Sequence, residues 1–182
     1  MERYQRIWRA AAVIVCCAAL LAQVPDVAQQ AATTWLAKDC DEGEKQALDA
    51  IIAQFKTPLE PVFLQALADG PSPQQLAAEQ AATAQRFQQR QEALKTGKGL
   101  GLSEADLRAA RAVTSEEYTR QQMDNFVLRY KSRAVAGLGI VDGEKGRAAL
   151  VALAADTNSP LRSSAQAALR RLAGPQGQYR KK

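Results

Sequence analysis

Carboxylates, lysines, hydroxyls and thiols are the side chains that this 182-residue chain offers for catalysis, because it contains no histidine. The lack of histidine excludes Ser-His-Asp and Cys-His nucleophiles, a histidine general base and histidine metal ligands. Three cysteines alone do not complete the usual four-ligand site of a structural zinc ion. We find no constellation of catalytic, cofactor-binding or metal-ligating residues, and we therefore predict that the protein is not an enzyme.

Glutamates are the groups that an alternative, enzymatic function would use. Six of them could serve a carboxylate-dependent enzyme that cleaves peptidoglycan, and these are Glu42, Glu44, Glu60, Glu79, Glu116 and Glu117. Clefts that bind sugars usually carry aromatic platforms, whereas aromatic residues make up 5% of this chain. The sequence therefore favours a binding function over this alternative.

Two short motifs imitate ligand sites. Asp39, Asp41, Glu42 and Glu44 cluster like calcium ligands, but the glycine falls at the fifth position and Ala50 stands at the twelfth. A solvated helix N-terminus explains these acids better, since the helix dipole favours negative charge there. The alternating glycines of residues 96–101 lack the Gly-Lys-Ser/Thr sequence of a phosphate loop, so we interpret them as a loop between helices.

The net charge of +5 is concentrated at the two ends of the chain. Arg3, Arg6 and Arg9 outweigh Glu2 at the start, and the residues 180–182 are all basic. The chain between carries no net charge, whereas binding to nucleic acid typically needs a basic stripe on a folded face. We therefore expect no nucleic-acid partner.

The first 22 residues have the pattern of an export signal. A basic segment to Arg9 precedes the thirteen apolar residues 10–22, fewer than the roughly 20 of a membrane-spanning helix. We predict a signal peptide or a short N-terminal anchor over residues 1–22, and hence a periplasmic protein or one anchored in the inner membrane. Cleavage after Ala22 would leave Cys40 as the one thiol of the mature protein. We interpret Cys40 as a small residue close to the start of a helix, and a disulfide to another chain is the alternative.

The composition predicts an all-α fold, because alanine makes up about a fifth of the chain and strand-forming residues are scarce. We expect residues 23–40 to be a tether or a helix, residues 41–173 to form the α-helical domain, and residues 174–182 to be a basic tail. The predicted helices cover 41–55, 58–68, 73–95, 103–111, 114–138, 144–155 and 160–173. The third helix is expected to be partly exposed or to pack through Ala77, Ala81 and Ala84, and Gly139 with the Asp142-Gly143 pair is expected to end the fifth.

The end of the domain carries a recognisable pattern. Its core is SRAVAGLGIVDGEKGRAALVALAADTNSPLRSSAQAALRRLAG, residues 132–174, and a shift of 34 residues superposes Ala134 on Ala168 and Leu138 on Leu172. Residues 127–173 resemble a HEAT-like repeat of the short bacterial type. The resemblance implies two antiparallel helices stacked on the helix before them, with Asp156 and Arg162 as an ion pair. We predict a compact bundle of antiparallel hairpins with this repeat at its C-terminal end, and an unrelated helical bundle is the alternative.

Helical-repeat proteins present stacked surfaces to other macromolecules more often than they do chemistry. We therefore predict an exported, non-catalytic protein-interaction or scaffold module of a bacterial cell envelope. Its expected partner is another protein, with no small-molecule substrate and no cofactor. Membrane association is expected only through the N-terminal segment, because Arg170, Arg171 and the basic tail are explained by a helix C-terminus and a solubilising end.

Overall fold

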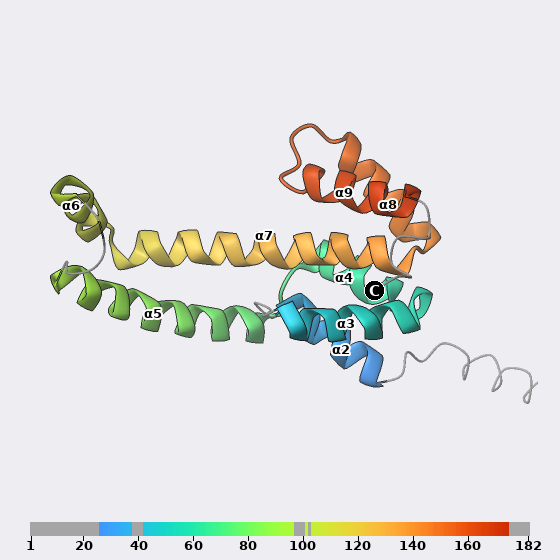
Figure 1. Cartoon of the computed structure of the whole chain (residues 1–182), viewed down its shortest axis with the longest axis horizontal. Helices are drawn as coiled ribbons and strands as arrows, with labels where there is room; N and C mark the ends of the chain where they lie inside the picture. The colour runs from blue at the N-terminus through green and yellow to red at the C-terminus, as the bar shows by residue number, and fades with distance from the viewer. Residues whose placement is uncertain (1–25, 38–41, 97–100, 102, 175–182) are drawn as a thin grey trace, which may run out of the picture.

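The computed structural model describes residues 26–37, 42–96, 101 and 103–174, and over these residues the chain is all-α (Figure 1). The elements in chain order are α2 (Asp26–Ala37), α3 (Glu42–Phe55), the 3-10 helix η1 (Thr57–Leu59), α4 (Glu60–Asp69), α5 (Pro73–Thr96), α6 (Glu104–Ala112), α7 (Ser115–Val141), α8 (Glu144–Ala155) and α9 (Arg162–Ala173). The predicted fold class is confirmed.

The molecule consists of a head and a projecting arm, which share α7 (Figure 1). In the arm (residues 73–96 and 103–128), α5 runs antiparallel to the first half of α7 and α6 lies at the tip. In the head (residues 26–37, 42–69 and 129–174), the second half of α7 lies between α4 on one side and the α8–α9 hairpin on the other. The long α7 therefore contacts α5 in the arm and both α4 and the α8–α9 hairpin in the head.

The core of the head is built on the apolar face of α4. Leu59 and Phe63 are fully buried, and the ring of Phe63 packs edge-on against Trp35 at 5.7 Å between centroids. On α7, Gly137 leaves room for this ring, because a Cβ atom there would lie 2.5 Å from two Phe63 ring carbons. A glycine in the helix thus lets α4 approach α7 closely.

The second half of α7 differs from the sequence prediction at its end. The helix passes through Gly139 and ends at Val141, where Asp142 takes the left-handed conformation with φ 53°. A Cβ atom at Gly139 would lie 2.9 Å from that of Ala168 on α9. Gly139 therefore serves the packing of α9 rather than the termination of α7.

Residues 26–37 correct the expectation of a tether. Trp35 and Leu36 of α2 are buried in the main core, and the Trp35 indole N–H donates a 2.8 Å hydrogen bond to Asp49 of α3. The Arg133 guanidinium of α7 donates a 3.3 Å hydrogen bond to the carbonyl of Leu36, where a cation meets the negative end of the helix dipole. Over this range the chain is a core helix.

The α8–α9 hairpin follows α7 as the sequence predicted, but its detail differs from what the resemblance implied. Asp156 and Arg162 do not pair: Asp156 accepts from the backbone N–H of Asn158, and Arg162 donates to the carbonyl of Ala154. The hydroxyl of Ser159 accepts from the Leu161 backbone N–H at 3.2 Å, and α9 begins at Arg162, two residues later than expected. Each group of the expected ion pair is bonded locally instead.

The predicted signal or anchor of residues 1–22 and the tail beyond Gly174 lie outside the described residues. Among the helices that the structure does describe, none combines the length and apolarity needed to cross a membrane.

Tyr130 gives the core a defined response to alkaline pH. Burial raises the pKa of its phenol above the usual 10.0, while a hydrogen bond with Gln75 acts in the opposite direction. As the pH rises above about 10, the unfolded chain loses this proton first, so stability falls with pH. We expect the alkaline loss of unfolding free energy to be smaller in Tyr130→Phe, measured by urea unfolding at increasing pH. The same change at the half-buried Tyr118 is the control, and an equal effect of both variants would contradict the assignment.

Candidate interaction surface

The candidate glutamates are dispersed over the molecule. Glu60 is buried in the head, Glu79 lies on the arm, Glu116 is exposed at the start of α7, and Glu117 completes the capping box with Thr114. The side chains of Glu42 and Glu44 are outside the description, as are Asp39, Cys40 and Asp41 of the calcium-like cluster. Within the described ranges no three acidic or thiol groups gather as a metal site.

Glu60 has a structural partner of its own. Its Oε1 atom accepts a 2.6 Å hydrogen bond from the backbone N–H of Gly146, the third residue of α8. An N-cap side chain would normally accept this bond, but the N-cap of α8 is Gly143. The carboxylate of α4 thus caps a helix that is remote in the sequence.

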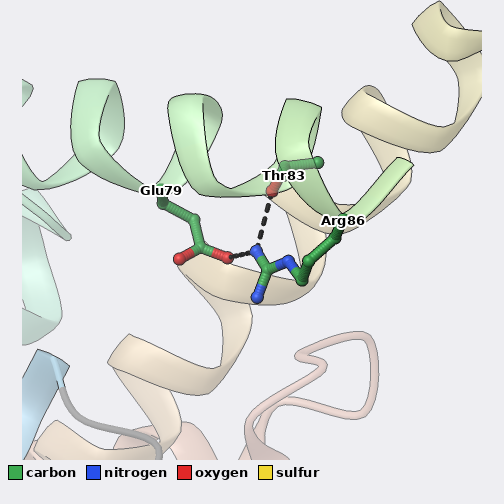
Figure 2. Close-up of polar contacts among 3 residues, drawn as sticks. All are labelled: Glu79, Thr83 and Arg86. Carbon is green, nitrogen blue, oxygen red and sulfur yellow. Dashed lines mark hydrogen bonds and ion pairs between the residues drawn. The ribbon is translucent and has the colours of Figure 1, made fainter. Parts of the chain in front are cut away.

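The polar groups of the arm lie in the seam between α5 and α7. Figure 2 shows Arg86 reaching along α5 to Glu79, with which it forms an ion pair, and to the hydroxyl of Thr83 at 2.9 Å. Thr83 is fully buried, and the Nε atom of Arg86 is buried without a hydrogen-bond partner. Charged and hydroxyl side chains therefore occupy positions where a helix pair usually carries apolar residues.

Aromatic contacts hold the far end of this seam. Phe87 of α5 lies 5.4 Å from Tyr118 of α7 between ring centroids, and the guanidinium of Arg90 lies 5.4 Å above the same Tyr118 ring. Arg111 of α6 donates two hydrogen bonds, of 3.1 and 2.7 Å, to the carbonyl of Leu94 near the end of α5. Packing at the tip thus fixes the two long helices and α6 together.

The outer face of α5 is the unusual surface of the molecule. All three charged residues between Pro73 and Gln91, namely Glu79, Arg86 and Arg90, are turned into the seam and only partly exposed. The exposed residues of the same stretch, called the outer α5 face below, are Pro73, Gln74, Ala77, Ala78, Gln80, Ala81, Ala84, Gln85, Gln88 and Gln89. The surface of a soluble helix usually carries charges, so this distribution is inverted.

Two sequence expectations are settled by this arrangement. The third predicted helix is partly exposed, as expected, but Ala77, Ala81 and Ala84 face outward and do not pack against the rest of the fold. The sequence indicated only that Glu79, Arg86 and Arg90 share one side of a helix, because they are spaced by seven and four residues.

A second polar, uncharged surface lies on α2. A hollow of about 390 Å³ is lined by Gln29, Gln30, Thr33 and Thr34, and the Thr33 hydroxyl donates to the carbonyl of Gln29 at 2.9 Å. The hollow holds no carboxylate or other titratable group among its lining residues.

Comparison of the chain with protein-family models, with curated proteins and with solved structures found no match.

Proposed function

We propose that this protein is an exported, non-catalytic interaction module of a bacterial cell envelope, and that the outer α5 face binds another protein. The observation that carries the proposal is the inverted charge distribution of α5: the three charged residues between Pro73 and Gln91 point into the α5–α7 seam, and the exposed residues of this stretch are alanine, glutamine and one proline. Interfaces between proteins are depleted of charge at their centres, as this face is.

The chemistry of the face suits association with a helix or an extended segment. Alanine allows another backbone to approach closely, and each glutamine offers one carbonyl acceptor and two N–H donors. Covering such a face removes no charge from water, so binding avoids the large desolvation cost of an ion, while the glutamine amides require hydrogen-bond partners in the complex. The three charges of this stretch already have partners inside the arm, because Glu79 pairs with Arg86 and Arg90 lies over Tyr118.

The shape of the molecule supports the same proposal. The arm projects beyond the core of the head, which makes α5 accessible along its length (Figure 1). The export pattern of residues 1–22 supports a place in the envelope, and the HEAT-like resemblance of residues 127–173 supports a protein built of stacked helical hairpins.

Site-specific photo-crosslinking tests the proposal in native cells. A photoreactive residue at Ala81, in the middle of the outer α5 face, is expected to capture a discrete protein that mass spectrometry identifies. The same residue at Asn125, which is exposed on α7, is the matched control and is expected to capture none. Equal capture from both positions, or none from Ala81, would refute the assignment of this face.

A charge placed on the face should weaken the same interaction. The variant Ala84→Glu buries an unpaired carboxylate in the complex, and we expect capture from Ala81 to fall by about tenfold or more. Asn125→Glu adds the same charge to the arm outside the face, and it is expected to leave capture unchanged. Circular dichroism of both variants establishes that the arm is folded.

A further inference from the structure

Helix α8 is more apolar than its place in the fold requires. Its last eight residues, 148–155, contain no polar side chain, yet only Leu150 among them is buried. Four of the others are exposed on one side of the helix and are called the α8 stripe: Ala148, Val151, Ala152 and Ala155. Their spacing of three, one and three residues places them on a single face.

The α8 stripe has the character of a contact surface. Val151 is 54% exposed and is one of the few large apolar side chains that the described part of the chain leaves in solvent. A helix segment that is apolar on every side is normally buried on every side, whereas among the described elements α8 packs mainly against α9 and α7, with a smaller contact to α4. The small side chains beside Val151 would let another helix approach closely.

The charges at the ends of the α8 stripe indicate what covers it. Glu144 is exposed four residues before Ala148, toward the opposite edge of the stripe from Lys145. Lys145 precedes the stripe and Asp156 follows it, and both of these side chains are exposed. They are eleven residues apart, which is about three helical turns, so they lie along the same edge of the helix. Neither of them forms an ion pair within the described residues.

We propose that the α8 stripe binds the α8 stripe of a second copy of this chain, antiparallel and about a two-fold axis. In such a pair the same edges of the two helices meet end to end, so Lys145 of each copy faces Asp156 of the other. The contact is isologous, so each dimer would contain two Lys145–Asp156 ion pairs. Other occupants match these charges less well. A basic segment such as residues 180–182 could pair with Asp156 but would repel Lys145, and a lipid surface would leave Asp156 without a cationic partner.

The expected strength follows from the size of the surface. One pair of twelve-residue helices forms an interface below the size of stable complexes, so we expect a reversible dimer with a dissociation constant on the order of 100 μM. This dimer is independent of the outer α5 face, which lies on a different helix and would remain exposed in each copy.

Sedimentation equilibrium of the full-length protein tests the proposal. We expect a monomer–dimer equilibrium that Val151→Asp weakens by more than about 100-fold, because each dimer would then bury two carboxylates near its axis. Ala167→Asp, which changes an exposed alanine of α9, is the matched control and should leave the equilibrium unchanged. A protein that stays monomeric, or a dimer that survives Val151→Asp, would overturn the proposal.

Charge reversal tests the orientation. Lys145→Asp and Asp156→Lys each place like charges together twice, and each is expected to weaken the dimer by about tenfold. The double variant restores both pairs and should return the dissociation constant to within about threefold of the original. Failure of the double variant to recover, or a cross-link from Ala152→Cys to residues 1–25 or 175–182 of the same chain, would assign the α8 stripe to another occupant.

Discussion

Phe63→Ala is expected to remove about 3–5 kcal/mol from the free energy of unfolding, which is the usual cost of deleting a buried aromatic ring. Phe63 has no exposed surface and joins α4 to Trp35 of α2 and to Gly137 of α7. The cavity would thus open where three helices meet, and neighbouring side chains have little freedom to fill it. Urea unfolding followed by circular dichroism measures the loss.

The same site allows a more specific test through Gly137. In the wild-type background, Gly137→Ala forces a methyl group against the Phe63 ring, and we expect a net loss of about 1–3 kcal/mol. In the Phe63→Ala background that contact is gone, so the higher helix propensity of alanine should make the same change stabilising by about 1 kcal/mol. An effect of the same sign in both backgrounds would contradict the packing of the ring on Gly137.

Local chemistry made the helix starts predictable from sequence. Ser103 accepts the backbone N–H of Asp106, and Thr114 forms the full reciprocal capping box with Glu117, so α6 and α7 begin next to the predicted positions 103 and 114. The predicted break between residues 55 and 58 is also present, with Thr57-Pro58 in the 3-10 helix η1. These features depend on residues three or four positions apart, and such spacing is visible in one sequence.

Tertiary packing determined what the sequence pattern did not. Gly139 has the signature of a helix end but lies inside α7, because only a glycine fits against Ala168 of α9. The helix of residues 26–37 is held by Asp49 and Arg133, which are distant in the sequence. Neither contact has a local signal.

The candidate interaction surface was likewise predictable in its local spacing but not in its tertiary orientation. The spacing of Glu79, Arg86 and Arg90 fixes that they share one side of α5, but it does not fix whether this side faces water or α7. The pairing of Glu79 with Arg86 and the position of Arg90 over Tyr118 favour the inward orientation, since each charge gains a partner there. Two helices distant in sequence must be placed together before this preference is visible.

Glu60 is the second residue whose replacement should have a large effect. Its carboxylate accepts the Gly146 N–H at the N-terminus of α8, where a helix leaves its first backbone donors without partners of its own. We expect Glu60→Ala to cost about 2–4 kcal/mol, because the buried N–H of Gly146 loses its acceptor. Glu60→Gln keeps an acceptor oxygen and should cost only about 1–2 kcal/mol. Urea unfolding and hydrogen exchange at the Gly146 amide measure both effects.

Gly143 supplies the decisive control, because it is the N-cap position that Glu60 replaces. A Cβ atom at Gly143 would overlap the carboxylate of Glu60, so Gly143→Ser alone must push this buried carboxylate away from the Gly146 N–H and should be destabilising by about 1–2 kcal/mol. In the Glu60→Ala background the space is free, and a serine at the N-cap can accept the Gly146 N–H itself and recover about 1 kcal/mol. The same substitution is therefore expected to harm the wild-type protein and to stabilise the variant. If Gly143→Ser were harmless with Glu60 present, or gave no recovery without it, Glu60 would not be the cap of α8.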